Sequence, residues 1–268
     1  MVSINRKGSF MKSHNIPLLD GRYWLALLAA SMLGTTFGDY VSEDLQFTYA
    51  GAVISFAILF GAILLFERKS PWRTIAWYWV AVVIFRSMAT TLGDTISRTL
   101  NLGYGSVSLV LAIALIAFVA ITSYLRSAGG FTQDESGIGN RKTLKVDSLY
   151  WAALLIASVF GTTFGDFMWD DTGLGYGRAS LVLGIVLTVL FIWDLRSKRV
   201  SDFRYWGIVA MVRTSGTAMG DFLSEGAPEL GFLYAAITMV IVLTLVLAMP
   251  LPGTRKLATE EISEIRKK

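Results

Sequence analysis

The chain has 268 residues, of which 54% are hydrophobic and 16% are charged, and its mean hydropathy is +0.55. A soluble domain carries about a quarter charged residues, so this composition favours an integral membrane protein. The chain has no cysteine and one histidine, His14, in a polar N-terminal tail, which excludes disulfide frameworks, thiolate or imidazole zinc sites and Ser-His-Asp catalysis in the membrane part.

Eight apolar segments have the length of roughly 17–25 residues that a bilayer-crossing helix requires. In chain order they cover 22–42, 50–66, 74–97, 104–125, 148–168, 177–194, 203–223 and 230–250. The sequence therefore predicts an all-α polytopic membrane protein with eight transmembrane helices. The expected parts are a cytoplasmic N-terminal tail (1–21), a first four-helix half (22–126), a flexible cytoplasmic linker (127–147), a second four-helix half (148–250) and a cytoplasmic C-terminal tail (251–268).

The basic residues lie mainly on one side of these segments. Twenty of the 24 lysines and arginines fall in the tails or flank the loops after the second, fourth and sixth segments. The opposite loops carry Glu43, Asp44, Asp170, Asp171, Glu225 and Glu229 against Arg98 and Arg178. By the positive-inside rule we expect both termini in the cytoplasm. The net charge of +4 then reflects membrane topology, and no nucleic-acid partner is expected.

A two-segment repeat occurs four times along the chain. Each copy opens with Tyr-Trp and has an Asp fifteen residues after the Trp; Gly precedes the Asp, and Thr and a small residue stand four and five positions before it. The aspartates are Asp39, Asp94, Asp166 and Asp221, and the threonines are Thr35, Thr90, Thr162 and Thr217. Because every copy holds two segments, all four copies are predicted to run the same way, as two four-helix halves in parallel orientation.

The copies differ eight residues before the Asp. Copies one and three have Ser31 and Ser158 there, whereas copies two and four have Arg86 and Arg213. A charged residue so deep in a segment requires a partner or water. Each arginine is interpreted either as an ion pair with an aspartate of a neighbouring helix or as a gate or substrate anchor.

Three other features of the repeat have structural interpretations. The Tyr-Trp pairs are typical of interfacial anchors. Small residues four apart, such as Gly34 and Gly38, predict close packing among the first helices of the repeats, with the second helices outside. Leu-Gly-Tyr-Gly at 102–105 and 174–177 lacks the lysine of a nucleotide loop and is interpreted as a tight turn, with Tyr104 and Tyr176 at the outer interface.

The Gly-Thr-Thr-x-Gly-Asp repeats followed by Leu-Gly-Tyr-Gly resemble bacterial membrane proteins labelled "uncharacterised membrane-anchored protein". This resemblance covers about residues 20–250 and implies the same architecture in a bacterial cytoplasmic membrane. A weaker similarity is to cation/proton exchangers with a Glu-x-Gly-Asp-Lys-Thr motif. Here Thr36, Thr91, Thr163 or Ala218 stands at the Glu position, and no lysine follows the Asp.

The repeated Asp and Thr residues are the candidate functional site. Thr at i−4 shares a helix face with Asp, so four parallel helices would gather four carboxylates and four hydroxyls around one axis. Oxygen ligands without cysteine or histidine suit hard cations such as Mg²⁺, Mn²⁺ or Ca²⁺. We therefore expect a transporter or channel for a small cation, divalent or proton-coupled, with the four Asp as candidate metal ligands and Arg86 and Arg213 as gate or ion pair.

Two other functions are alternatives. A non-catalytic membrane protein would bind a small anionic or organic ligand, a lipid or a partner, using the deep arginines for a carboxylate or phosphate. An intramembrane aspartyl protease of the Gly-x-Gly-Asp type is disfavoured, because Thr or Ala holds the first Gly position and a dyad needs only two carboxylates. We expect no enzyme and no cofactor beyond a divalent cation as substrate. The expected partners are the lipid bilayer, a small ion or molecule and, in a homo-oligomer, further copies of the chain.

Overall fold

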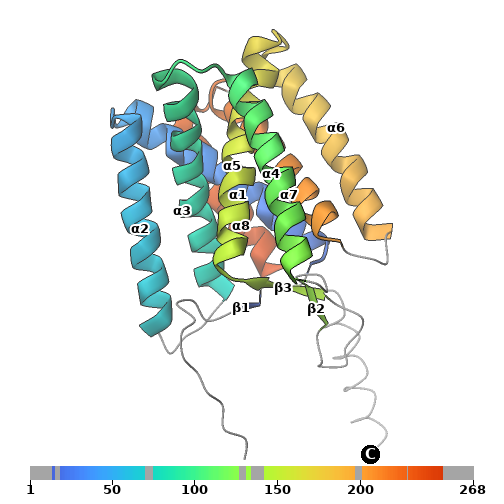
Figure 1. Ribbon diagram of the computed structural model, residues 1–268. Helices are drawn as coiled ribbons and strands as arrows, with labels where there is room; N and C mark the ends of the chain where they lie inside the picture. The colour runs from blue at the N-terminus through green and yellow to red at the C-terminus, as the bar shows by residue number, and fades with distance from the viewer. Residues whose placement is uncertain are drawn as a thin grey trace, which may run out of the picture.

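The computed structural model describes residues 14–15, 19–69, 75–126, 131–133, 142–196, 201–227 and 229–249. The C-terminal tail at 251–268 and most of the N-terminal tail lie outside these residues. The described part contains eight α-helices: α1 (Gly21–Asp39), α2 (Tyr49–Lys69), α3 (Ile75–Asp94), α4 (Tyr104–Arg126), α5 (Ser148–Asp166), α6 (Gly175–Arg196), α7 (Asp202–Ser224) and α8 (Gly231–Ala248) (Figure 1). Each helix coincides with one predicted segment.

Three short strands form an antiparallel sheet at one end of the helical bundle, here called the sheet end (Figure 1). They are β1 (His14–Asn15), β2 (Phe131–Gln133) and β3 (Lys142–Val146), in the order β1-β3-β2, with His14 opposite Val146 and Thr132 opposite Thr143. The sequence predicts a polar tail and a flexible linker for these residues, so the three short strands are an addition to the all-α bundle. The β-branched residues of β3 favour a strand.

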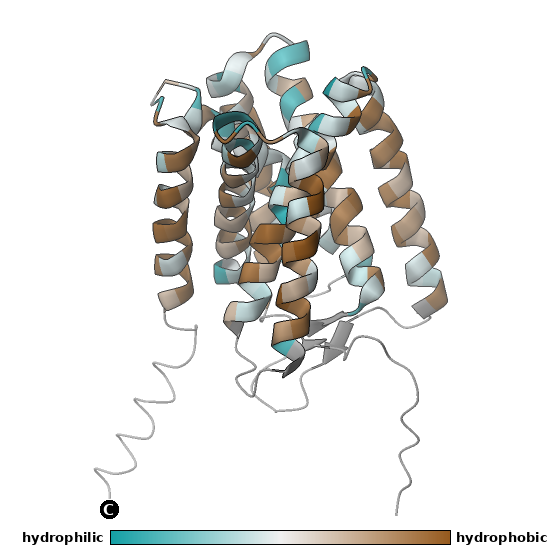
Figure 2. Ribbon diagram, turned by 90° about the vertical axis from the view of Figure 1, so that its left-hand side faces the viewer, coloured by the Kyte–Doolittle hydropathy of each residue, from teal (hydrophilic) through white to brown (hydrophobic). Residues whose placement is uncertain are grey.

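Six helices, α2, α3, α4, α5, α6 and α8, are long and apolar enough to cross a membrane. Figure 2 shows hydrophobic residues along most of the length of the outer helices. Among the residues the structure describes, α1 and α7 do not meet this criterion, and α7 carries Arg204, Arg213 and Asp221 within its length. The six apolar helices indicate a membrane protein.

The four odd-numbered helices form an inner ring, in which α1 contacts α3, α3 contacts α5, α5 contacts α7 and α7 returns to α1. The even-numbered helices lie outside: α2 packs on α3, α4 on α5, α6 on α7 and α8 on α1. Each outer helix thus covers the inner helix of the following repeat, and α8 closes the circle. In the apolar segments, 78% and 61% of α3 and α5 are buried, against 17% to 28% of the outer helices.

Side-chain caps explain where inner helices begin. Asp20 accepts a hydrogen bond from the Tyr23 backbone N–H at 2.9 Å, and Asp147 accepts one from Tyr150 at 2.9 Å. Ser201 caps α7 through the backbone N–H of Arg204 at 3.3 Å. Such caps satisfy backbone donors that the first helical turn leaves without partners. They fix the starts of these helices, and hence how far along each helix its Asp lies.

The glycine before each Asp lets neighbouring inner helices approach closely. A Cβ atom on any of these glycines would lie 2.7–3.5 Å from the motif threonine of the next inner helix. The pairs are Gly38 with Thr90, Gly93 with Thr162, Gly165 with Thr217 and Gly220 with Thr35. Because these contacts return from α7 to α1, the same residue pair closes all four sides of the ring.

The closest approaches occur one turn earlier, where Gly34 contacts the stem of Arg86 and Gly161 contacts the stem of Arg213. A Cβ at Gly34 would lie 2.5 Å from the Arg86 Cβ, and one at Gly161 would lie 2.7 Å from the carbonyl carbon of Arg213. The two arginines can therefore enter the ring only because the facing helix has no side chain there.

We expect Gly161→Ala to lower the stability of the protein although alanine favours helices. The added methyl group would meet the backbone of α7, and overpacking of this kind costs about 1–3 kcal/mol. Gly220→Ala is the matched control, because its Cβ would lie 3.5 Å from its nearest neighbours, an ordinary contact. Thermal unfolding in detergent should show a lower midpoint for Gly161→Ala only; equal midpoints for both variants would contradict the packing.

Candidate functional site

A pocket opens where the inner helices end, at the pole opposite the sheet; we call it the acidic pocket. It is lined by Thr35, Asp39, Glu43, Thr90, Asp94, Arg98, Thr162, Asp166, Trp169, Thr217, Asp221, Glu225 and Phe232. All eight repeated Asp and Thr residues are in this lining. The space between these side chains admits water-sized groups, which is enough for a small ion or ordered water.

The eight residues come from four helices, one Asp and one Thr from each. The aspartates are 4–8% exposed and the threonines 1–2% exposed. The threonines lie one turn deeper along each helix than the aspartates. They therefore form the floor of the pocket, and the carboxyl groups form its walls.

In three repeats the chain continues past the Asp into a π-helical turn: η1 (Tyr40–Asp44), η2 (Thr95–Thr99) and η3 (Phe167–Asp171). Turns of this kind are rare and are often found at functional sites. They carry Glu43, Arg98 and Trp169 to the mouth of the pocket. In the fourth repeat α7 itself continues to Ser224, and Glu225 follows at the mouth.

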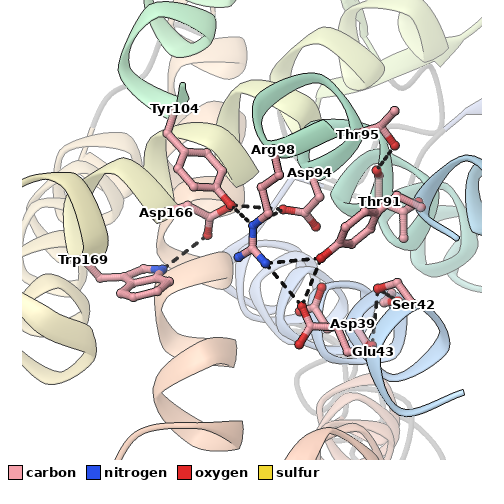
Figure 3. Close-up of polar contacts among 12 residues, drawn as sticks. Asp39, Ser42, Glu43, Thr91, Asp94, Thr95, Arg98, Tyr104, Asp166 and Trp169 are labelled. Atoms are coloured by element: carbon pink, nitrogen blue, oxygen red, sulfur yellow. Dashed lines mark hydrogen bonds and ion pairs between the residues drawn. The ribbon is translucent and has the colours of Figure 1, made fainter. Parts of the chain in front are cut away.

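Arg98 links the elements around the mouth (Figure 3). Its Nη1 lies 3.4 Å from Glu43 Oε1 and 3.2 Å from the Tyr49 hydroxyl, and its Nε lies 3.7 Å from Asp94 Oδ1. Its Nε also donates to the Tyr104 hydroxyl, which donates in turn to Asp94 Oδ1 at 3.3 Å. Separately, Trp169 donates to Asp166 at 3.4 Å.

Tyr104 was expected at the outer membrane interface, and this prediction was wrong. The residue is 6% exposed, because its hydroxyl bridges Arg98 and Asp94 inside the protein. The turn before it agrees with the sequence: Gly103 has φ +74°, a conformation that glycine adopts without strain. Tyr176 stacks on Trp169 with ring centroids 4.2 Å apart and donates to Glu225 at 2.9 Å.

Arg86 lies fully buried beneath the pocket floor and contacts the other three inner helices. Its Nη1 donates to the Ser158 carbonyl at 2.7 Å and to Thr162 Oγ1 at 2.8 Å. Its Nη2 donates to Thr35 Oγ1 at 3.0 Å, to the Arg213 carbonyl at 3.4 Å and to Thr217 Oγ1. Three of the four repeated threonines thus accept hydrogen bonds from one guanidinium.

The interpretation of Arg86 as an ion pair with an aspartate differs from this geometry. Threonine hydroxyls lie between the guanidinium and the carboxyl groups, so hydrogen bonds take the place of direct ionic contact. The other interpretation, a gate or a substrate anchor, stays a prediction. Arg86 closes the pocket floor towards the sheet end.

Arg213 occupies the equivalent position on α7 and has different surroundings. It is fully buried, and its Nε, Nη1 and Nη2 have no hydrogen-bond partner among the described residues. The inner helices carry Tyr23, Tyr78, Tyr150 and Tyr205 near their starts, and Tyr205 stands eight residues, about 12 Å of helix, before Arg213. The expected pair of Arg213 with an aspartate is not formed in the described part of the chain.

These four tyrosines, one from each Tyr-Trp pair, form what we call the tyrosine cluster. The hydroxyl oxygens of Tyr23 and Tyr205 are 2.7 Å apart, those of Tyr78 and Tyr150 2.8 Å, and those of Tyr23 and Tyr78 3.4 Å. The hydroxyls meet inside the ring because equivalent positions of parallel helices converge. The cluster also shows that the inner helices all start at this end, as all their aspartates meet at the other.

The prediction that the Tyr-Trp pairs anchor the protein at the membrane interface was therefore wrong. Trp24 is 2% exposed and donates to Asp194 Oδ2 at 3.0 Å, and Trp79, Trp151 and Trp206 are 2–8% exposed. The rings pack in the core against tyrosines and neighbouring helices, for example Trp24 against Tyr205 with centroids 5.7 Å apart. Both members of each Tyr-Trp pair therefore pack or form hydrogen bonds inside the helical bundle.

The four aspartates do not form a compact ligand set. Within the described ranges, no three acidic or histidine side chains are placed so that they could hold a metal ion. This differs from the expectation that Asp39, Asp94, Asp166 and Asp221 directly coordinate one metal. Each carboxyl group belongs to a different wall of the pocket, and the helix-to-helix spacing keeps them apart.

Comparison with known families agrees with the four copies of the repeat. Residues 22–70, 77–127, 149–200 and 204–251 each match the family model described as Repeat of Unknown Function (DUF347). The chain belongs to this repeat family. Each DUF347 match covers one inner helix and the outer helix that follows it. No curated protein and no solved structure matches the chain.

Sequence reasoning missed three charged residues of this DUF347 site: Glu43, Arg98 and Glu225. Each stands four residues after a repeated Asp. Residues four apart share a helix face, so this spacing was the signal that would have placed them at the pocket. They appeared to belong to outer loops because the helical turn continues beyond the apolar segment.

Proposed function

We propose that this DUF347 protein is a membrane transporter or channel for a small cation, with the acidic pocket as its ion-binding site and without an enzymatic step. The observation that carries the proposal is the composition of the pocket. Six carboxyl groups, from Asp39, Glu43, Asp94, Asp166, Asp221 and Glu225, surround it together with one guanidinium. Buried carboxylates are costly without a compensating cation or proton.

The size and spacing of the pocket favour a small occupant. In the described conformation the pocket has space for water-sized groups between its polar side chains, which favours a small charged occupant. Because the carboxyl groups are spread over separate walls, the ion is a proton or a cation that keeps part of its water shell. Mg²⁺ commonly binds through one or two carboxylates and several waters.

The described conformation supports access from the pocket mouth only. Below the pocket, Arg86 binds the floor threonines, and the tyrosine cluster follows nearer the sheet end. Transport requires Arg86 to leave the threonines, since its guanidinium connects all four inner helices at this level. Arg86 is thus the proposed gate.

The proposed membrane orientation places the sheet end and both termini in the cytoplasm of a bacterium. The excess of lysine and arginine in the tails and in the sequence segments that precede the odd-numbered helices supports it. We also propose that α1 and α7 cross the membrane with the six apolar helices. Their 19 and 23 residues correspond to about 28–35 Å of helix, comparable with the hydrocarbon thickness. The outer helices shield their polar residues from lipid.

A cation titration tests the occupancy of the pocket. We expect the thermal midpoint of purified protein at low ionic strength to rise with one cation among Na⁺, K⁺, Mg²⁺, Mn²⁺, Ca²⁺ and H⁺. Binding at a hundred times its dissociation constant stabilises by about 2.7 kcal/mol. Asp166→Asn should lower the apparent affinity for that cation, read from the midpoint titration, at least tenfold.

The matched control is Asp171→Asn, which removes the same charge from an exposed residue five positions further along that does not line the pocket. The Asp171→Asn variant should keep the cation-dependent rise of the thermal midpoint. A midpoint that responds to none of the six ions, or equally in wild type and Asp166→Asn, would refute the cation site.

A further inference from the structure

We propose that Arg213 and the tyrosine cluster form a second site, which binds a small monovalent inorganic anion of the chloride class on the sheet-end side of the gate. The acidic pocket is a cation site on the other side of Arg86. The two sites use different residues, so the anion site goes beyond the proposed transport function and stands on separate observations.

The first observation is the state of Arg213. Its guanidinium offers five N–H donors, and all three of its nitrogens lie without an acceptor in the described structure although the residue is fully buried. An uncompensated buried charge is among the most costly features in a protein. Arg86, at the equivalent position, has five oxygen acceptors. The contrast indicates that Arg213 binds an acceptor that the described part of the chain does not supply.

The second observation is what surrounds this guanidinium. The tyrosine cluster supplies hydroxyl groups, which rotate and can donate to an anion as readily as to one another. Tyr23, Tyr150 and Tyr205 are 1–2% exposed, so they separate Arg213 from solvent at the sheet end. N–H and O–H donors around one positive charge, enclosed by protein, recognise an anion rather than a cation.

The third observation concerns competing carboxylates. Among the described residues, Arg213 forms neither a hydrogen bond nor an ion pair with a carboxylate. Asp194, a carboxylate near the sheet end, is already 3.1 Å from Arg204 and accepts from Trp24. The aspartates of the acidic pocket lie beyond the Thr and Arg86 layers. Arg213 therefore has no internal counter-ion within the described part of the protein, and a free anion can take that place.

Burial defines the class of anion. Arg213 is 0% exposed, so the anion must shed most of its water and fit inside a ring whose helices touch through glycine. Chloride meets both conditions, and it matches one guanidinium in charge. Gluconate carries the same charge but is too large, so it serves as the non-binding replacement.

The test compares wild type and Arg213→Met in chloride and in gluconate at equal ionic strength. For wild type we expect a saturable rise of the thermal midpoint with chloride, and equilibrium binding of one radiolabelled chloride per chain. Arg213→Met should lose both, and in gluconate it should be at least as stable as wild type because it removes an uncompensated charge. Arg98→Met is the matched control: it removes a cation from the pocket mouth and should keep the chloride response.

Absence of chloride binding to wild type would overturn the proposal, even if Arg213→Met does not fold. Chloride binding that Arg213→Met retains would also overturn it. A variant with a conserved fold, Tyr78→Phe, adds a second check: loss of one hydroxyl donor should raise the half-saturating chloride concentration at least threefold. An unchanged value would remove the tyrosine cluster from the site.

Discussion

Replacing Arg86 with methionine should destabilise the protein by about 3 kcal/mol, more than any other single arginine substitution. The change leaves the Thr35 hydroxyl without its buried donor and removes one hydrogen bond each from Thr162 and the Ser158 carbonyl, which keep the bond between them; a buried polar group left unpaired costs about 1–3 kcal/mol. Part of this loss is offset because a buried charge is also removed. The midpoint of thermal unfolding should fall by roughly 6–12 °C.

Arg98→Met is again the control, because it also removes one positively charged side chain. The Arg98 side chain is 43% exposed, and its pair with Glu43 contributes about 0–1 kcal/mol. Its contacts with the buried Asp94 and Tyr104 add to this, so the midpoint of Arg98→Met should fall, but by less than that of Arg86→Met. The midpoint of Arg86→Lys should lie between those of Arg86→Met and Arg98→Met, because a lysine ammonium cannot reach acceptors on three helices at once. A midpoint for Arg86→Met within one degree of wild type would contradict the view that this guanidinium joins the inner ring.

The arrangement of the inner ring could be predicted because the repeats are equivalent. Four parallel copies related by an axis bring equivalent residues together, so the spacing of Asp39, Asp94, Asp166 and Asp221 was enough to expect one shared pocket. The glycine before each Asp pointed to close helix contacts for the same reason. The small residues four apart also predicted that the second helices lie outside.

The roles of the tyrosines and arginines could not be predicted in the same way. A Tyr-Trp pair at the start of an apolar segment has the composition of an interfacial anchor, and only the packing of four helices shows that the hydroxyls meet inside. Arg86 and Arg213 occupy equivalent positions in the repeat, yet one has five acceptors and the other none in the described structure. Their partners come from other helices, which no local pattern records.

The closure of the ring also lies beyond local sequence patterns. An outer helix could pack on the inner helix of its own repeat or on the next one, and hydropathy is the same in both cases. The structure shows the second arrangement, in which α8 returns to α1. This exchange ties each repeat to its neighbour and makes the four copies a single bundle.

The central claim is that the acidic pocket carries a cation through the membrane, and ion uptake into proteoliposomes tests it most directly. The decisive comparison is between Asp39→Asn/Asp166→Asn, which removes two pocket charges, and Asp44→Asn/Asp171→Asn, which removes two exposed charges from the same two repeats outside the pocket lining. Six cations are offered, with and without a proton gradient, and empty liposomes give the leak.

We predict flux of at least one cation in wild type and in the Asp44→Asn/Asp171→Asn control, and a loss of at least tenfold in Asp39→Asn/Asp166→Asn. The reason is that Asp39 and Asp166 are two of the six acidic groups in the pocket. These groups replace the water molecules that the ion loses on binding. Equal flux in both double variants would place the pathway elsewhere. No flux above leak from folded wild-type protein, for any of the cations, would contradict the account.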